Sequence, residues 1–478
     1  MVIKLRILGS MVKVAGDVPV EIHQKLDGLM QFKPEGVEYC DKCKGDADHA
    51  PEWDGIVHLY RNREFPVGLL ERVEMLLLLE KVQYEVVDNR VMDPPRPIVT
   101  RIKLRDYQKR IVEDAIAAKS ALIPAATGSG KTLMAAEIIA RLGQNKALFV
   151  VPTIEILDQT QAAFATNMNC QVGWVGDGEA VHPEGERVTV ITWQSIAAGL
   201  RNKNIQRRVW RDFLAQYNVI LFDEVHHVSS DAVYEVALYS GARFRYGLSG
   251  TLFRVDHESE LKFYGAIGEA VKGITASELI ALGYLVAPHI RFIKTKPRLY
   301  GRRDKWMNIY TESIVENEER NRIIVEEAFN FVRQGRRTLV LVSQIKHGNL
   351  LKRMMTANLP EDVAVRFEFV NSKAKDRPDI VQKFRNGEYQ LIIATSVFDE
   401  GVDFPEVQAI ILAGAGKSQV KAVQRVGRGL RICPEIDKKD VKVIDFTDGS
   451  KYLYEHSHER YDIWAKEPRF KITGDVPK

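Results

Sequence analysis

A glycine-rich segment spanning Ala125–Thr132 carries the residue types that bind phosphate. Its glycines let successive backbone N–H groups curl around phosphate oxygens at the start of the helix expected over 133–141, where the helix dipole favours anions. Lys131 supplies a cation for the terminal phosphates of a nucleotide, and the Thr132 hydroxyl is placed for Mg²⁺. A chance glycine-rich turn is the competing interpretation of the segment taken alone. The predicted nucleotide-binding residues are Ala125, which replaces the glycine of the strict pattern, and Thr127, Gly128, Ser129, Gly130, Lys131 and Thr132.

Two adjacent carboxylates, Asp223 and Glu224, follow an apolar strand that begins near Tyr217. In an open parallel sheet, ligands gather outside the carboxyl ends of the strands. An Asp at this place can hold Mg²⁺, and the Glu beside it can orient and deprotonate an attacking water. A polar cap after a buried strand is the alternative, and it explains one acidic residue better than an ordered pair. The two motifs together predict ATP hydrolysis with Mg²⁺ as cofactor.

Apolar strands that alternate with helical stretches must position these residues. The first set of strands is expected at 121–124, 147–151, 188–192 and 219–223, and the second at 337–342, 391–395, 409–412 and 441–445. This rhythm is typical of parallel sheets covered by helices. Residues before 98 mix short alternating strands with a helix expected from Gly68 to about Val82. We therefore predict an α/β chain of two tandem doubly wound lobes, preceded by a small α+β accessory domain.

The predicted domains are 1–98 for the accessory domain, 99–286 for the first lobe, 287–455 for the second lobe and 456–478 for a C-terminal tail. Prolines in the segment 93–97 break regular structure and indicate a linker. Residues 291–305 carry seven cations and one Asp. A solvated loop is the ordinary interpretation of such a run, but its place between two lobes favours contact with nucleic acid. The contact residues predicted there are Arg298, Arg302 and Arg303.

The whole-chain composition indicates an ordinary globular protein. The 478 residues are 45% hydrophobic and 28% charged, with a net charge of +4, so a nucleic-acid binder would have to concentrate its cations in a groove. No apolar run approaches the roughly 20 residues that cross a bilayer, and no signal peptide is recognisable. Four cysteines give no disulfide framework, which favours a cytoplasmic setting. Cys40, Cys43 and His49 suggest zinc, but a structural zinc needs four ligands, so an exposed turn is preferred.

Asp223-Glu-Val-His226 resembles the second motif of the superfamily 2 helicases. In that family, an element like Leu104–Gln108 reads adenine through its Gln, and a motif like Ser249–Thr251 couples hydrolysis to movement between two RecA-like lobes. Loops like those at Pro152–Thr153 and Thr192–Gln194 grip the backbone of the tracked strand. The resemblance assigns Arg105, Gln108 and Asp223 to ATP binding, Pro152, Thr153, Thr192 and Gln194 to nucleic acid, and His226, Ser249, Gly250 and Thr251 to coupling.

The second half of the chain continues the resemblance. The segment Gln424–Arg431 matches the family motif that faces bound ATP across the cleft between the lobes. Arg428 and Arg431 would reach the γ-phosphate, where a planar guanidinium stabilises the transferring phosphoryl group. The segment 395–403 resembles the fifth motif of the family. The resemblance assigns Lys131, Glu224, Arg428 and Arg431 to catalysis, Gly401 and Asp403 to the ATP cleft, Thr395 to the nucleic-acid backbone, and Gln424 and Arg425 to coupling.

Three segments resemble the XPB and UvsW branch of the superfamily: Leu104–Gln108, Leu279–Leu285 and Gln424–Arg431. In the N-terminal region, Trp53–Gly55, Phe65–Leu70 and Tyr84–Arg90 resemble the front domain of phage UvsW-type helicases. The resemblance implies an ATP-dependent DNA helicase or translocase that unwinds or branch-migrates forks and junctions in recombination, repair or replication. A monomer is expected, with no membrane association.

Three alternatives stay open at this point. An RNA helicase is possible because motor contacts go mostly to the backbone, although the second motif is Asp-Glu-Val-His and not Asp-Glu-Ala-Asp. A duplex-DNA translocase that does not separate strands would carry the same motifs. An ATP-gated clamp without hydrolysis would tolerate loss of Glu224 and Arg428, and both are present.

Overall fold

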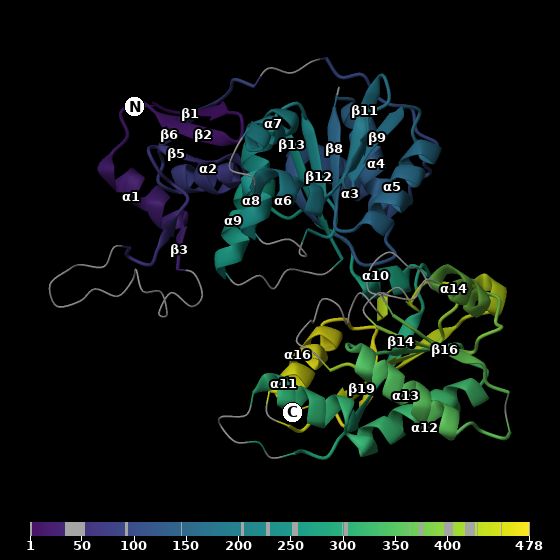
Figure 1. Ribbon diagram of the computed structural model, residues 1–478. Helices are drawn as coiled ribbons and strands as arrows, with labels where there is room; N and C mark the ends of the chain where they lie inside the picture. Colours follow the sequence, from purple (N-terminus) through teal and green to yellow (C-terminus); the bar gives the residue numbers. More distant parts are fainter. Residues whose placement is uncertain are drawn as a thin grey trace. The chain divides into compact units, whose positions relative to one another are not determined.

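The computed structural model describes residues 2–33, 53–90, 94–144, 146–201, 205–225, 230–250, 257–298, 300, 305–362, 364–371, 376–395, 405–415, 426–427, 429–450 and 452–477. The chain divides into two compact units. The first comprises residues 1–125 and 130–273, and the second comprises residues 126–129 and 274–478. Each unit contains one seven-stranded sheet (Figure 1). The predicted fold class is therefore confirmed.

The front domain is a four-stranded sheet in the order β5-β2-β1-β6, with β1 parallel to β6 and antiparallel to β2. Strand β1 alternates exposed and buried residues, which places Ile3, Leu5 and Ile7 in the core beneath helices α1 and α2. Its elements are β1 (Val2–Leu8), β2 (Met11–Ala15), α1 (Val20–Leu29), β3 (Gln31–Phe32), β4 (Val57–His58), β5 (Glu64–Pro66), η3 (Val67–Leu69), α2 (Leu70–Leu79) and β6 (Gln83–Asp88).

The first lobe has the strand order β10-β9-β11-β8-β12-β13-β7, parallel throughout except for the hairpin of β9 and β10. Its strands are β7 (Ser120–Pro124), β8 (Ala147–Val151), β9 (Gln171–Gly176), β10 (Glu179–Val181), β11 (Glu186–Thr192), β12 (Val219–Phe222) and β13 (Phe244–Ser249). Its helices are α3 (Asp106–Ala118), α4 (Lys131–Leu142), α5 (Ile154–Asn167), α6 (Trp193–Arg201), α7 (Ile205–Leu214), α8 (Ser230–Ser240) and α9 (His257–Ile267).

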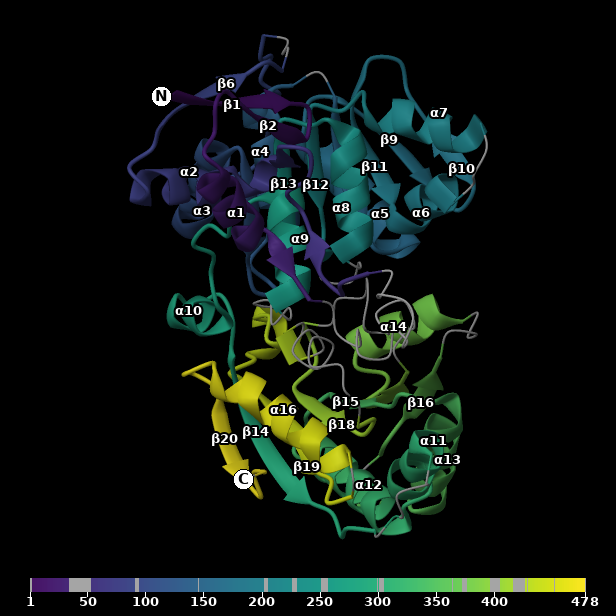
Figure 2. The same cartoon turned by 90° about the vertical axis from the view of Figure 1, so that its left-hand side faces the viewer.

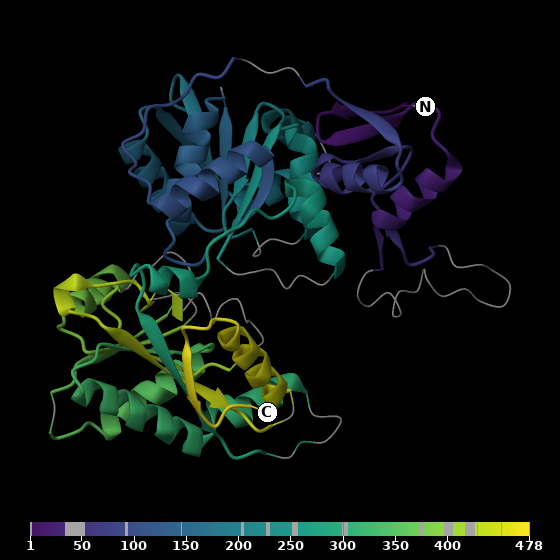
Figure 3. The same cartoon turned by 180° about the vertical axis from the view of Figure 1, so that it is seen from behind.

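Helices cover both faces of this first sheet, as doubly wound topology requires. Residues of α6, α8 and α9 share one apolar core with β8 and β12. Helices α3, α4 and α5 cover the opposite face, blue in Figure 3. Strand β12 is buried along its whole length, so its continuous apolar run is that of a central parallel strand.

The second lobe has the strand order β16-β17-β15-β18-β19-β14-β20, with parallel pairing throughout. Its strands are β14 (Ala287–Lys294), β15 (Thr338–Leu341), β16 (Phe367–Val370), β17 (Leu391–Ala394), β18 (Ala409–Leu412), β19 (Asp440–Thr447) and β20 (Lys471–Gly474). Its helices are α10 (Ala276–Ala281), α11 (Trp306–Tyr310), η5 (Thr311–Val315), α12 (Glu318–Arg333), α13 (Ile345–Ala357), α14 (Arg377–Arg385), η7 (Pro434–Ile436) and α16 (Leu453–Ala465).

One sequence-based boundary differs from the structure. Residues 456–478 are not a separate tail, because they hold most of α16 and the edge strand β20, which lies beside β14 (Figure 2). Arg460 at the centre of α16 is buried and donates to both carboxylate oxygens of Asp445, which anchors the helix to the sheet. The first four residues of the basic segment 291–305 form the end of strand β14.

The front domain packs directly on the first lobe. Ser10 Oγ donates to the carbonyl of Ala237 on α8 at 2.7 Å, and Leu261 of α9 belongs to the apolar core of the front domain. Arg72 of α2 pairs with Glu269 and lies over the ring of Tyr264. The two therefore form one unit, in spite of the proline-rich connection between them. Within the described part of the chain, no helix has the length and apolarity that crossing a bilayer requires.

Candidate nucleotide site

The glycine-rich segment Ala125–Thr132, called the phosphate loop below, follows strand β7 and runs into helix α4, which begins at Lys131. Gly128 and Gly130 have φ angles of +86° and +83°, a region that side chains other than glycine rarely adopt. A Cβ on Gly130 would also collide with the side-chain amide of Gln108. The backbone conformation therefore favours glycine at 130, and a larger residue there would also displace the side chain of Gln108.

Lys131 and Glu224 are brought together although 93 positions separate them in the chain. Lys131 Nζ lies 3.0 Å from Glu224 Oε1 and 3.4 Å from the carbonyl oxygen of Ala125. The second carboxylate oxygen of Glu224 accepts a hydrogen bond from the backbone N–H of Gly250 at 3.2 Å. One carboxylate thus connects the phosphate loop to the Ser249–Thr251 motif.

Asp223 follows β12 and is almost fully buried. Its backbone N–H donates to Val150, and its Oδ1 accepts from the backbone N–H of Glu224 at 3.0 Å. Glu224 itself has a φ of +44°, a strained conformation for a residue with a side chain. Burial, and after it the charge of Glu224, raise the pKa of Asp223 to about 7, while Lys131 acts in the opposite direction.

These buried oxygens fit a divalent cation. A carboxylate whose charged form is disfavoured gains stability from a cation nearby, and carboxylate and hydroxyl oxygens are ligands that Mg²⁺ accepts. Among the described residues, there is no group of three or more His, Cys, Asp or Glu side chains that could bind a metal ion, so a metal here would need other ligands as well. A nucleotide phosphate would supply such ligands.

Gln108 occupies the first turn of α3 next to the phosphate loop. Its Oε1 accepts from the backbone N–H of Arg105 at 2.8 Å in a capping arrangement, and its side chain is buried. Arg105 is exposed, and its guanidinium lies 3.3 Å from the hydroxyl of Tyr107. The position of Gln108 beside Gly130 is compatible with nucleotide contact; its role in reading adenine stays a prediction.

The two loops assigned to nucleic acid lie at one edge of the first sheet, because β8 and β11 are parallel neighbours. Gln194 Nε2 donates to the carbonyl of Pro152 at 2.7 Å, which ties the loops together. Thr153 caps α5 by accepting from the backbone N–H of Ile156. Thr192 is only 3% exposed, and its hydroxyl lies 2.9 Å from that of Ser195. Its side chain therefore serves the start of α6.

In the second unit, Thr395 is buried and its backbone N–H donates to Val370. Arg431 forms an isolated antiparallel β-bridge with Leu285, and the backbone N–H of Val286 donates to the carbonyl of Leu430. The end of the Gln424–Arg431 segment therefore pairs with the segment that leads into β14. Arg298 is exposed, and its backbone N–H donates to Ser450 Oγ at 3.1 Å. In the first unit, Ser249 is buried, and its carbonyl oxygen accepts a hydrogen bond from the backbone N–H of Ala125.

Several predicted residues lie outside the described residues. They are His226, Thr251, Arg302, Arg303, Gly401, Asp403, Gln424, Arg425 and Arg428, together with the proposed zinc candidates Cys40, Cys43 and His49. The structure also contains a charged group that sequence reasoning missed. Arg245 stands inside the buried strand β13, and a cation within an apolar run is the signal that could have identified it.

Two protein families match parts of the chain. Residues 101–254 match the family described as the res subunit of type III restriction enzymes, and residues 319–433 match the helicase conserved C-terminal domain. The first range holds the phosphate loop, Asp223 and Glu224. The second holds most of the second lobe, including Arg431.

Curated relatives cover most of the chain. The DNA 3'-5' translocase XPB2 of Sulfurisphaera tokodaii is 27% identical over 74% of this chain and 84% of its own length. The ATP-dependent DNA helicase uvsW of Enterobacteria phage T4 is 22% identical over 77% of this chain and 76% of its own length. The chain spans 55% of the length of a putative DNA 3'-5' helicase Rad25 from Haloarcula marismortui.

Solved structures agree on the fold. A fragment of a putative HsdR subunit of a type I restriction enzyme from Vibrio vulnificus has a TM-score of 0.56 and 18% identity, covering 78% of this chain and 68% of that one. Dbp5 of S. cerevisiae, bound to RNA and ADP BeF3, has a TM-score of 0.52 and 14% identity, covering 78% of this chain and 90% of that one.

Proposed function

Because the chain belongs to the superfamily 2 helicases of the XPB and UvsW type, we propose that it is an ATP-dependent DNA helicase or translocase. The observation that carries the proposal is the link from Lys131 through Glu224 to the backbone of Gly250. A motor must couple its phosphate site to movement, and this carboxylate contacts both the phosphate loop and the segment assigned to coupling.

The chemistry proposed for the first unit follows from these contacts. On ATP binding, Lys131 moves from Glu224 to the terminal phosphates, because phosphate offers it a stronger charge partner. Glu224 would then orient and deprotonate the attacking water. Asp223 and Thr132 would hold Mg²⁺, which neutralises charge on the phosphate oxygens.

The second unit is proposed to supply the arginines that act on the γ-phosphate. Arg428 and Arg431 belong to the Gln-x-x-Gly-Arg-x-x-Arg pattern, and a guanidinium stabilises charge spread over the transferring phosphoryl oxygens. An arginine that comes from a different lobe makes hydrolysis depend on closure of the lobes. ATP turnover would in this way drive movement along the strand.

The nucleic acid is proposed to be DNA, and in particular forked or branched DNA. Support comes from the names of the relatives and from the front domain, which is packed against α8 and α9 of the motor lobe. The loops at Pro152 and Gln194, which a hydrogen bond joins, are proposed to contact the sugar-phosphate backbone of the DNA. Arg298 provides an exposed cation for a further phosphate contact. We further propose that the protein acts as a monomer in the cytoplasm; Cys170 and Cys433 are free thiols in the described part.

A side-by-side ATPase assay tests the proposal. Turnover is measured with duplex, single-stranded and forked DNA and with RNA of the same sequence, using Lys131→Ala as the inactive control. Stimulation by DNA above RNA, highest with forks, is expected. Equal or greater stimulation by RNA would favour an RNA helicase, and stimulation by duplex without strand separation would favour a translocase.

A further inference from the structure

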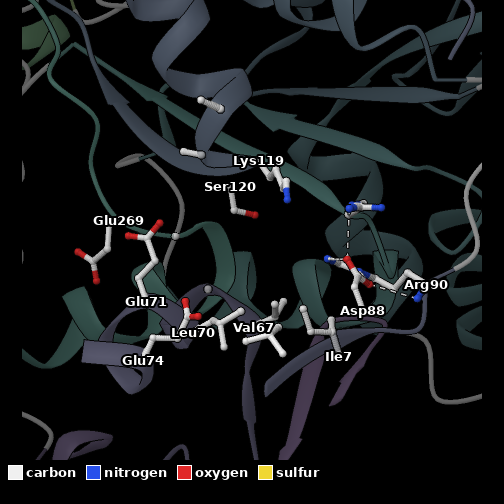
Figure 4. A pocket seen from close by; sticks show the side chains of 16 residues that line it. Ile7, Val67, Leu70, Glu71, Glu74, Asp88, Arg90, Lys119, Ser120 and Glu269 are labelled. Carbon is white, nitrogen blue, oxygen red and sulfur yellow. Dashed lines mark hydrogen bonds and ion pairs between the residues drawn. The ribbon is translucent and has the colours of Figure 1, made fainter. Parts of the chain in front are cut away.

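The cavity between the front domain and the first lobe has a volume of about 450 Å³ (Figure 4). Glu71, Glu74 and Glu269 lie on one side of it, and Asp88 and Arg90 lie on the other. Arg90 Nη2 lies 2.8 Å from Asp88 Oδ2, so these two charges offset each other. Because charges of both signs line the cavity, they select no class of ligand.

The second lobe carries an exposed aromatic surface that does indicate a class of ligand. All six tryptophans of the chain lie among the described residues, and Trp306, at 39%, is the only exposed one. Tyr452 is 38% exposed and lies edge-on to Trp306, with the ring centroids 6.3 Å apart. Single exposed apolar side chains are normal, but two large exposed rings in contact form a surface suited to binding.

The two rings are held in place by the fold. The Trp306 ring centroid lies 5.1 Å from that of His456 and 5.8 Å from that of Tyr310, and both of these neighbours are buried. Tyr310 belongs to an apolar cluster that includes Leu453 of α16. Tyr452 has a φ of +62°, a conformation that persists only where the surroundings impose it. A ring that is already fixed loses little conformational entropy when a ligand stacks on it.

Two exposed cations belong to the segments that carry these rings. Lys305 precedes Trp306 and is the N-cap of α11. Arg298 is exposed, and its backbone N–H donates at 3.1 Å to the Oγ of Ser450, two residues before Tyr452. Proteins that bind single-stranded nucleic acid combine rings on which bases stack with cations that meet the phosphates. The residue types therefore match a single strand.

This surface follows the carboxyl ends of the strands in the second sheet. Strands β14 and β19 are parallel neighbours, and Arg298 and Tyr452 follow their carboxyl ends. Thr395, for which we propose contact with the nucleic-acid backbone, follows β17 at the same edge, because β17, β15, β18 and β19 are parallel as well. Ligands of open parallel sheets bind at this edge.

We propose that Trp306 and Tyr452 form a platform on which a base of single-stranded DNA stacks, while Lys305 and Arg298 contact the neighbouring phosphates. The inference rests on the proposed function and adds a contact with a base to contacts with the backbone. Every base has a π-face, so the platform would accept any sequence. It would favour an unpaired base, because a base within a duplex must first leave its stack.

Equilibrium binding to two single strands of equal length tests the platform, one with all its bases and one with abasic sites. Trp306→Ala should weaken binding of the normal strand about 5- to 150-fold, the range for one lost stacked base, and should hardly change binding of the abasic strand. Trp306→Phe keeps a ring and should keep most of the affinity. Leu359→Ala shortens an exposed apolar side chain elsewhere on the second unit and should bind both strands normally.

The phosphate contact has its own variant. Lys305→Gln should weaken binding of both strands alike and reduce the slope of log affinity against log salt by about 0.7. Lys119→Gln is the control, because Lys119 lies in the first unit on the wall of the cavity in Figure 4. It should leave the affinity and the slope unchanged.

Tryptophan fluorescence gives a readout that does not depend on affinity. At saturation the normal strand should quench the emission of the unaltered protein more than the abasic strand does, and Trp306→Phe should lose this difference. If Trp306→Ala does not fold, as circular dichroism would show, Trp306→Phe decides through this signal.

Two results would overturn the platform. One is an affinity in folded Trp306→Ala that is unchanged, as for a surface that contacts protein, or equally reduced for both strands. The other is a difference in quenching that persists in Trp306→Phe. Failure of the proposed function is distinct, because the unaltered protein would then bind neither strand and show no ATPase stimulated by DNA.

Discussion

Lys131 Nζ lies 3.0 Å from Glu224 Oε1, so the cation of the phosphate loop is paired with the proposed general base. This pair satisfies both charges without nucleotide. The other oxygen of Glu224 accepts a hydrogen bond from the backbone N–H of Gly250, in the segment for which we propose the coupling role. The arrangement predicts that nucleotide binding and the position of residue 250 depend on each other.

Replacing Glu224, the proposed general base, should affect ATP hydrolysis and ATP binding differently. Glu224→Gln should reduce DNA-stimulated ATP hydrolysis at least about a hundredfold, the usual scale of a lost general base. ATP affinity should stay equal or increase, because Lys131 no longer has a charged competitor for the phosphates. Steady-state ATPase and equilibrium nucleotide binding measure the two effects. Lys131→Ala is the contrasting variant, with both binding and turnover lost; near-normal turnover in Glu224→Gln would remove Glu224 from the mechanism.

The raised pKa of Asp223 predicts a pH-dependent stability. Its charged form is disfavoured in the folded protein, so Asp223 destabilises the native state progressively as the pH rises from about 4, near its ordinary pKa, toward 7. Above pH 7 the destabilisation has reached its full size. Without metal or nucleotide, Asp223→Asn should therefore be more stable than the unaltered protein at pH 8, by roughly 1–4 kcal/mol, and equal to it near pH 4. Denaturant unfolding at both pH values measures this.

Asp362 is the matched control for that experiment. It is an exposed carboxylate whose pKa is lowered, chiefly by its hydrogen bond with Arg333, so its charged form is favoured in the fold. Asp362→Asn should give no stabilisation at pH 8. A stabilisation of the same size in both variants would mean that the effect at Asp223 is not local.

Arg428 should act on the transition state. Arg428→Ala is expected to lower kcat about a thousandfold or more while ATP binding changes little, as for other arginines of this role. Arg366→Ala, an exposed arginine of the same unit, is the control and should retain activity. A collapse of nucleotide affinity with normal turnover of bound ATP would make Arg428 a binding residue instead.

The basic segment after β14 should contact nucleic acid. Replacing Arg298, Arg302 and Arg303 with Glu should weaken DNA binding and reduce the slope of its salt dependence. Binding would then neutralise fewer phosphates and so release fewer counterions from the DNA. Lys439→Glu, which alters an exposed cation elsewhere on the second unit, should leave the slope close to normal. An unchanged slope in the triple variant would identify the segment as a solvated loop.

Docking of the front domain can be weakened at one glycine. A Cβ on Gly68 would collide with the carbonyl oxygens of Tyr264 and Gly265, so Gly68→Ala should destabilise the first unit by roughly 1–3 kcal/mol. It should also impair processing of forks and junctions more than ATPase stimulated by long single strands. Gly28→Ala on α1 is the control, because its Cβ would meet nothing within 4 Å.

A truncation that removes residues 1–95 tests the same role more severely. It should keep ATPase stimulated by single strands and lose fork regression and junction migration. The deletion uncovers Leu261, so circular dichroism and gel filtration must first show a folded, unaggregated protein. A folded truncation that processes forks like the full chain would show that the front domain does not select branched DNA.

The sequence by itself determined the features that are local in the chain. The phosphate loop is eight consecutive residues, and its glycines have the conformations that its composition indicates. The strands of both lobes were predictable because a central parallel strand is a short apolar run between turns, as β12 and β17 are. The predicted helix near Gly68 is present as η3 and α2 for the same local reason.

Only the tertiary structure decided which distant residues meet. Strands β12 and β7 flank β13 in the sheet, and this order brings Glu224 to both Lys131 and Gly250. The pairing of β20 with β14 makes the expected tail part of the second lobe. Thr192, which the sequence placed in a loop that binds nucleic acid, has a buried side chain in the structure. Strand order and domain docking depend on contacts between segments far apart in the chain, and local residue patterns carry no record of them.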